Sequence, residues 1–254
     1  MLKIETIDIK EPVYDITVDG NHNFFANGIL VHNCQEITLP TVPMASYEKE
    51  VHEVNQNDLV EELKKYINEF NVTDVKIINT DEIGTIKLEV TRDSSEIALC
   101  TLAAINLGNV KNLDDLEGTC RNAVRALDAL LSYQDYMVTA ARTSTDKYRP
   151  LGIGITNLAY YLAKNNMKYG DKAAYDLMHD TMEAVSFYCI KASIELAKEK
   201  GRCPGFEDTK WADGLLPIHR YNKNVDKITK TSLKLDWKWL GEQLALYGIR
   251  PLVS

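Results

Sequence analysis

Three consecutive residues, His32, Asn33 and Cys34, could together break one peptide bond and prepare another. The side-chain amide of an asparagine can attack its own main-chain carbonyl, which closes a succinimide ring and releases the next residue. A neighbouring histidine can protonate the leaving group near neutral pH. The thiol of Cys34 can accept an acyl group as a thioester, although only about 3% of an unperturbed thiol is ionised at pH 7. Taken alone, the tripeptide could equally be an accident of a loop.

The residues before this tripeptide predict a small β-unit that would position it. Three short extended runs cover residues 13–18, 22–26 and 29–31. The turn signals Asp19-Gly20-Asn21 and Asn27-Gly28 separate them. We expect these strands to carry Asp15, His22 and His32 towards one end of the unit.

Four blocks in this region resemble the C-terminal splicing blocks of inteins. The blocks are Val13-Tyr14-Asp15, His22-Asn23-Phe24, Asn27-Gly28 and Val31-His32-Asn33-Cys34. The resemblance implies that Asp15 and His22 are an acid/base pair and that His32 assists cyclisation by Asn33. Cys34 would be the first residue after the intein. Residues 1–33 are therefore expected to be a small all-β, Hint-type C-terminal intein fragment.

An intein also needs an N-terminal nucleophile and a Thr-x-x-His-type block, and neither occurs in residues 1–33. A split intein, whose N-terminal fragment arrives on another polypeptide, would explain this, and a truncated sequence is the alternative. The strand-like Leu2-Lys3-Ile4 directly after Met1 favours the split form. Two basic residues against five acidic ones give the segment a net charge of −3, so we expect the partner fragment to be basic.

Composition places the chain among ordinary globular proteins. It has 254 residues, of which 45% are hydrophobic and 26% charged. The net charge of −8 argues against a general nucleic-acid-binding surface. No apolar run approaches the ~20 residues that span a bilayer, and no signal-peptide pattern opens the chain. Five irregularly spaced cysteines without a CxxC pair offer no zinc or iron–sulfur spacing and suit a reducing cytoplasm, where we expect the protein to reside.

Beyond Cys34, strands alternate with helices, which predicts an α/β protein with parallel pairing. In an expected strand over residues 34–41, Cys34 and Glu36 would face the same side, although a surface glutamate beside a buried cysteine is the simpler alternative. The apolar run 96–102 predicts a strand that is buried on both faces. A further buried strand is expected over residues 151–155, and helices are expected from residue 113 onward and over 158–164, 171–200 and 236–247.

The sequence pattern of residues 45–92 differs from that of the flanking segments. It predicts a small α-β-β insert that has no apparent catalytic residues. A helix is expected over residues 58–70, with Asp58 and Glu61 as a capping box. Two strands, over residues 75–79 and 85–90, should follow around a turn.

The rest of the chain resembles the large subunit of class I ribonucleotide reductase, over residues 34–43 and about 96–250. The matching stretches are Cys34-Gln35-Glu36 with Leu39-Pro40-Thr41, Glu96-Ile97-Ala98-Leu99-Cys100, Asn106-Leu107-Gly108, Ala126-Leu127-Asp128, Tyr133-Gln134-Asp135-Tyr136, Leu151-Gly152-Ile153-Gly154 and Tyr160-Tyr161-Leu162-Ala163. The resemblance implies that residues 34–254 form part of the reductase α/β barrel. The insert at 45–92 departs from the shorter connection of the bacterial form.

The reductase resemblance assigns roles to three residues. Cys34 would be the thiyl-radical cysteine, Glu36 the general base and acid, and Cys100 one of two reducing thiols; the alternative for Cys100 is a buried core cysteine. His32 occupies the position of the family's substrate-binding asparagine, so that residue and the second reducing cysteine must come from the upstream polypeptide. The family's phosphate-binding loop, relay tyrosines and C-terminal cysteines do not follow residue 250, so this chain alone should not turn over nucleotides.

Together the two resemblances imply a precursor that splices in trans to complete a reductase subunit. The implied partners are the N-terminal intein fragment, the reductase small subunit, thioredoxin or glutaredoxin, and a ribonucleoside diphosphate substrate. No cofactor is expected in this chain, because the small subunit supplies the radical. The alternative is a degenerate intein on a non-catalytic reductase fragment that acts as a folded passenger or an assembly surface.

Overall fold

A computed structural model describes residues 23–26, 29–32, 41–80, 84–220, 223–229 and 232–253, the first two ranges by their backbone alone. Contacts divide the chain into two units, Met1–Thr38 and Leu39–Ser254, which are described separately. In the first unit, β1 (Asn23–Ala26) and β2 (Ile29–His32) form an antiparallel hairpin in which Asn23 lies opposite His32. This confirms the predicted strands on either side of Asn27-Gly28. The predicted strands at 13–18 and 34–41 lie outside the described residues, apart from residue 41.

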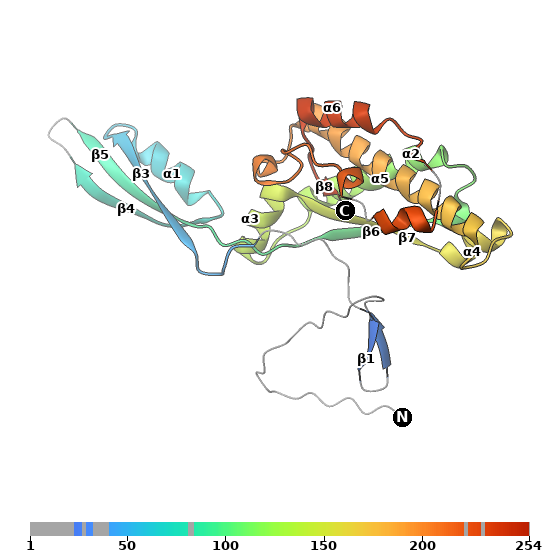
Figure 1. Ribbon diagram of the computed structural model, residues 1–254. Helices are drawn as coiled ribbons and strands as arrows, with labels where there is room; N and C mark the ends of the chain where they lie inside the picture. The colour runs from blue at the N-terminus through green and yellow to red at the C-terminus, as the bar shows by residue number, and fades with distance from the viewer. Residues whose placement is uncertain are drawn as a thin grey trace. The chain divides into compact units, whose positions relative to one another are not determined.

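A β-α-β-β unit begins the second part of the chain (Figure 1). It comprises β3 (Tyr47–Asn55), α1 (Leu59–Ile67), β4 (Val72–Thr80) and β5 (Thr85–Asp93). The strands form an antiparallel sheet in the order β3-β5-β4. Alternate residues of the central strand β5 are buried with Tyr66 of α1, so the unit has a small core of its own: Val54, Tyr66, Ile86, Leu88 and Val90.

The predicted α-β-β order was incomplete because it lacked β3. This strand lies at the edge of the sheet and has one buried residue, Val54, so its sequence has no apolar alternation. Helix α1 was predicted correctly. The capping box was wrong, because Asp58 makes no side-chain cap hydrogen bond and already has helical backbone angles.

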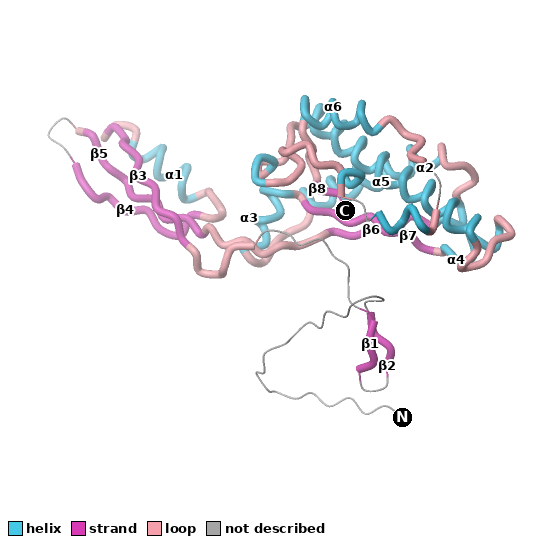
Figure 2. Tube along the Cα trace, in the orientation of Figure 1, coloured by secondary structure: helices cyan, strands magenta, loops and turns pink. Residues whose placement is uncertain are grey.

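In the described residues that follow, a parallel sheet is combined with five α-helices (Figures 1 and 2). The strands are β6 (Thr101–Asn106), β7 (Pro150–Thr156) and β8 (Leu252–Val253), paired in that order. The helices are α2 (Asp115–Tyr133), α3 (Thr139–Tyr148), α4 (Leu158–Lys164), α5 (Lys172–Lys200) and α6 (Trp237–Tyr247). Short 3₁₀ turns cover Leu107–Asn109, Phe206–Asp208, Pro217–His219 and Lys223–Lys227.

Two buried clusters hold this part together. One lies between the β6–β7 sheet and α2 with α5, and it includes Leu116, Val124 and Leu127, as the sequence pattern predicts. The other lies between α5 and α6. Parallel pairing is confirmed. Helix α5 runs unbroken to Lys200 and ends at Gly201, whose φ of +85° suits a residue without a side chain.

The predicted strand at residues 96–102 was wrong. The strand begins at Thr101 and ends at Asn106, and Leu102 is 66% exposed whereas Ile105 is buried. Helices α2 and α5 cover only one face of the sheet, so the side chains of β6 alternate between core and solvent. The barrel is not closed within the described residues. Among them, no helix is both long and apolar enough to cross a bilayer.

Candidate functional site

The uncovered face of β6 and β7 carries the one predicted site residue whose side chain is described. Cys100 precedes β6 and is exposed, as are Leu102, Ala104 and Asn106 at alternating positions along the strand. Across the parallel register, Leu102 and Ala104 pair with Gly152 and Gly154 of β7. A Cβ built on Gly154 would come no nearer than 4.0 Å to any other group, so the backbone of β7 is open at Gly154, whereas Gly152 is buried. This open face could receive a substrate beside a reactive thiol.

Cys100 differs from the other described cysteines. Its Sγ lies 4.0 Å from the carbonyl oxygen of Thr101, and it is exposed, which contradicts the alternative that it is a core cysteine. Cys120, Cys189 and Cys203 are buried. Burial raises the pKa of Cys203 to about 11, and a hydrogen bond with Cys120 together with burial raises the pKa of Cys189. Of these four, Cys100 is therefore the thiol that a partner can reach.

The carboxyl ends of β6 and β7 are joined by a polar bridge. The Oδ1 atom of Asn106 accepts hydrogen bonds from the Gly108 amide at 3.0 Å and from Nδ2 of Asn157 at 3.1 Å. Asn157 has a φ of +63°, a left-handed conformation that asparagine tolerates better than most residues. Nζ of Lys164 donates to the carbonyl of Gly108. The bridge fixes the edge of the sheet at which α/β proteins commonly bind ligands.

A buried charge cluster lies near the opposite ends of β7 and β8. Asp128 of α2 is fully buried and pairs with Nε of Arg149 at 2.7 Å, Nζ of Lys200 at 3.2 Å and Nε of Arg250 at 3.2 Å. Burial alone would raise the pKa of Asp128, but the Arg149 hydrogen bond and the surrounding cations hold that pKa below its ordinary value. In the sequence, Asp128 stands out only as part of the motif Ala126-Leu127-Asp128. The signal that could have found it is a lone acidic residue on the apolar face of a predicted helix.

One group of potential metal ligands occurs among the described residues. Its Glu183 is fully engaged, whereas Nδ1 of His179 and Oδ1 of Asp180 are buried without a hydrogen-bond partner. His179, Asp180 and Glu183 of α5 have ligand atoms within 4.8 Å of one another. However, Glu183 Oε1 accepts from the amides of Lys234 and Leu235 and from the Trp237 indole, and Asp180 pairs with the Lys234 ammonium. These bonds attach residues 234–237 to α5, which gives Glu183 a structural role.

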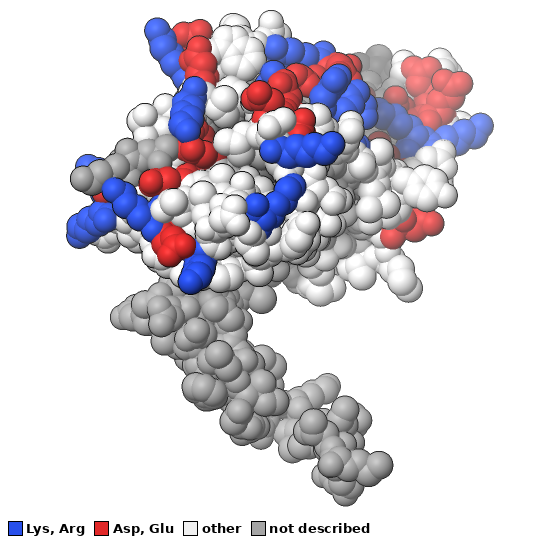
Figure 3. All heavy atoms as spheres, turned by 90° about the vertical axis from the view of Figure 1, so that its right-hand side faces the viewer, with Lys and Arg blue, Asp and Glu red and all other residues white. Residues whose placement is uncertain are grey.

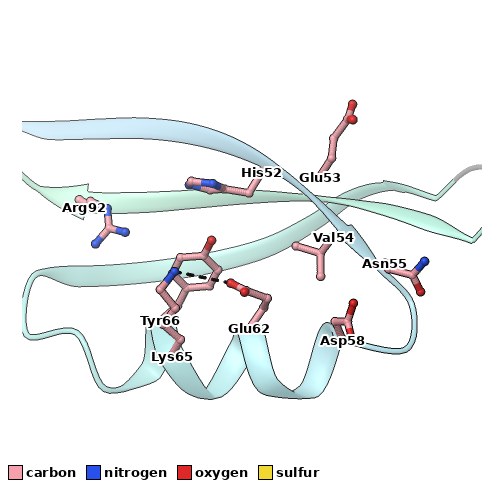
Figure 4. A pocket seen from close by; sticks show the side chains of 9 residues that line it. All are labelled: His52, Glu53, Val54, Asn55, Asp58, Glu62, Lys65, Tyr66 and Arg92. Carbon is pink, nitrogen blue, oxygen red and sulfur yellow. Dashed lines mark ion pairs between the residues drawn. The ribbon is translucent and has the colours of Figure 1, made fainter.

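A polar pocket of about 380 Å³ lies between β3 and α1 (Figure 4). Tyr66 forms its floor, with the ring of His52 5.5 Å away and the guanidinium of Arg92 at 5.9 Å. Glu62 pairs with Lys65 across 3.9 Å, and Arg92 pairs with Glu50 and Glu69. Because these charges neutralise one another, the pocket presents no defined ligand chemistry. Acidic and basic side chains are likewise interspersed on the face shown in Figure 3.

Most of the predicted site lies outside the described residues. This holds for Asp15, His22, Asn33, Cys34 and Glu36, while His32 is described only as the last backbone position of β2. Their proximity to one another and to Cys100 stays a prediction.

Comparison with known proteins identifies the family. The sequence model of the family "Ribonucleotide reductase, barrel domain" matches residues 20–252, a span that includes residues 20–33 of the predicted intein segment. The ribonucleoside-diphosphate reductase subunit alpha of Haemophilus influenzae is 50% identical over 158 residues, or 62% of this chain and 21% of that protein. The enterobacteria phage T4 subunit alpha is 44% identical over 171 residues (66% and 22%), and that of Helicobacter pylori is 28% identical over 226 residues (85% and 29%).

The chain thus spans about a fifth of the length of the first two of these relatives. The family match, by contrast, extends over most of the chain and includes β6, β7 and Cys100, and it ends at the first residue of β8. The chain belongs to the ribonucleotide reductase barrel-domain family.

Proposed function

We propose that this chain supplies part of a reductase alpha subunit that converts ribonucleoside diphosphates to deoxyribonucleotides, with Cys100 as one of its two reducing thiols. Family membership over residues 20–252 carries the proposal. The exposure of Cys100 beside an open sheet face supports it. The relatives are named as ribonucleoside-diphosphate reductase alpha subunits, which gives the substrate class.

In the proposed reaction, a thiyl radical on Cys34 abstracts the hydrogen atom from the ribose 3′ carbon. Glu36 removes and returns the proton of the 3′ hydroxyl, and the 2′ hydroxyl leaves as water. Cys100 and a second thiol supply the proton that leaves in this water and the hydrogen that replaces the hydroxyl on the 2′ carbon, and they close a disulfide. The hydrogen atom then returns from Cys34 to the 3′ carbon. A separate small subunit supplies the radical, and thioredoxin or glutaredoxin reduces the disulfide.

A Cys100→Ser substitution tests the reductase proposal. In a reductase assembled from this chain and the remaining segments of its alpha subunit, the substitution should abolish turnover, because serine cannot form the disulfide. Cys203→Ala, at a buried cysteine, should leave turnover unchanged. Circular dichroism of each variant establishes folding, and full turnover by folded Cys100→Ser would contradict the role.

We further propose that residues 1–33 form the C-terminal fragment of a split intein. A thioester on the N-terminal fragment transfers its acyl group to the Cys34 thiol, Asn33 cyclises and cleaves its bond to Cys34, and an S-to-N shift leaves an ordinary peptide bond. Asp15, His22 and His32 transfer the protons. The four sequence blocks support this proposal, and the β1–β2 hairpin is compatible with it.

Mixing the chain with a matching N-terminal fragment tests splicing. Intact-mass spectrometry should detect a ligated product and a released 1–33 peptide, and Asn33→Ala should stop at the branched intermediate. If the parent chain and Asn33→Ala both remained uncleaved, residues 1–33 would be a degenerate remnant. In that case the family match from residue 20 would identify residues 20–33 as reductase sequence.

A further inference from the structure

Glu96 lies where three segments of the chain meet. Its backbone forms a two-way antiparallel bridge with Val42, with N–O distances of 3.0 and 3.1 Å. Its buried carboxylate accepts a hydrogen bond from Nζ of Lys147 on α3 at 2.9 Å. The next amide, that of Ile97, donates to the carbonyl of Ala140 on the same helix at 3.1 Å. The segment that leads to Cys100 is therefore attached to α3 at two points within four residues of the thiol.

Lys147 is itself held independently of Glu96. Its ammonium also lies 3.3 Å from Oδ2 of Asp208 and 4.9 Å from the ring centre of Tyr148. Its carbonyl accepts from the Gly205 amide at 2.9 Å. Burial alone would lower the pKa of Lys147, but hydrogen bonding to Tyr148 and Glu96 raises that pKa above its ordinary value. Lys147 is thus a fixed positive charge against which the carboxylate of Glu96 is located.

We infer that Lys147, acting through Glu96, is a positioning residue for the Cys100 thiol. This inference rests on the proposed reductase function. The Lys147–Glu96 ion pair fixes the position of residues 96–100 along α3. It thereby places Cys100 directly before β6, beside the open face of the sheet. The same glutamate is bridged to Val42, which follows Cys34 by eight residues. The contacts described for the Lys147 ammonium are with Glu96, Asp208 and Tyr148, so its loss should affect the reaction step rather than substrate binding.

The decisive variant removes both charges together. Lys147→Met alone would leave a buried carboxylate unpaired, which could unfold the chain, whereas the double variant Lys147→Met/Glu96→Gln avoids that cost. In the assembled reductase we expect the double variant to lower kcat about 10- to 100-fold with KM unchanged. Lys147→Arg should retain most of the parent kcat. Arg125→Met, which breaks the Arg125–Glu199 ion pair elsewhere between α2 and α5, is the matched control.

Hydrogen exchange of this chain gives a readout that is independent of turnover. The Ile97 amide should exchange faster in the double variant than in the parent and at the parent rate in Arg125→Met. If the Ile97 amide of the double variant exchanged faster but kcat were unchanged, the ion pair would be a structural contact only, and the inference would be wrong. If the exchange rate of this amide were unchanged, the ion pair would not hold the segment, and the inference would also be wrong. If the parent reductase were inactive, the proposed function would be wrong, and so would this role for Lys147. The exchange rate of the Ile97 amide would still show whether the ion pair holds residues 96–100 in place.

Discussion

At the scale of single residues, Asp128 links α2 to the end of α5 and to the segments that lead into β7 and β8, through three cations. Asp128→Asn would leave Arg149, whose side chain is 7% exposed, without its ionic partner. Breaking a buried pair by removing one partner costs about 3–5 kcal/mol of unfolding free energy. Urea denaturation should show this loss, and Asp146→Asn, in an exposed pair with Arg142, should cost less than about 1 kcal/mol.

The depressed pKa of Asp128 also gives the stability a pH dependence. The folded state holds this carboxyl below its ordinary pKa, so the unfolded state binds the proton more tightly. The resulting stabilisation is fully present above the unfolded pKa of about 4 and is lost as the pH falls towards the folded value. Unfolding titrations of parent and Asp128→Asn should therefore converge in acid, and curves that stay parallel below pH 4 would contradict the assignment.

Thiol reactivity separates Cys100 from the buried cysteines. Maleimide labelling of the native chain at pH 8, read by peptide mass spectrometry, should modify Cys100 roughly 10-fold or more faster than Cys203, which is buried and has a pKa of about 11. If Cys100 and Cys203 were labelled at equal rates in the folded chain, the difference in their exposure would be wrong. As a control, both should be labelled at equal rates after denaturation.

The residues of the candidate site could be named from sequence only where a family motif includes them. Cys100 was found in this way, and the structure adds its exposure. Glu96 stands in the same motif as Cys100, but its ion pair with Lys147 was not predicted, because that contact depends on α3, a helix that the apolar pattern does not indicate. Helix α3 has alternating small and polar residues, Thr-Ala-Ala-Arg-Thr-Ser-Thr, which give no apolar periodicity, and it is held by buried Ala140, Ser144 and Thr145.

At the scale of elements, the turn after β6 depends on a glycine. A Cβ on Gly108 would lie 2.4 Å from Nδ2 of Asn157 and 2.9 Å from the Tyr160 ring. Gly108→Ala should therefore cost about 1–3 kcal/mol of unfolding free energy. Gly118 lies inside α2 with nothing near its Cβ position, so Gly118→Ala should stabilise the chain by about 0.5–1 kcal/mol. Thermal unfolding of both variants tests this contrast. It would be contradicted if both variants were less stable than the parent chain, or if neither were.

Element types were predictable wherever one face of an element is buried against the core. Helices α2, α4, α5 and α6 and strand β7 follow from their apolar patterns. The errors at β3 and β6 have a common cause: β3 is an edge strand, and β6 has one face that no described element covers. An apolar run such as residues 96–102 indicates burial on both faces only when partners exist on both sides.

At the scale of the whole molecule, the unit formed by β3, α1, β4 and β5 should be separable from the rest. Its buried residues form a cluster that shares none with the other two clusters, and the chain enters and leaves it beside the Val42–Glu96 bridge. Replacing residues 47–93 by a short Gly-Ser linker should leave the helical circular dichroism of the remainder in place. Collapse of that signal would show that the unit supports the fold.

Under the splicing proposal, the precursor becomes a reductase only after residues 1–33 have been removed. The direct measurement is a time course, after mixing with the N-terminal fragment and the remaining reductase components, of ligated mass and of deoxyribonucleotide formed. We predict that activity rises in parallel with the ligated product and stays absent in Asn33→Ala. Reductase activity in the Asn33→Ala precursor equal to that of the spliced parent would contradict the account.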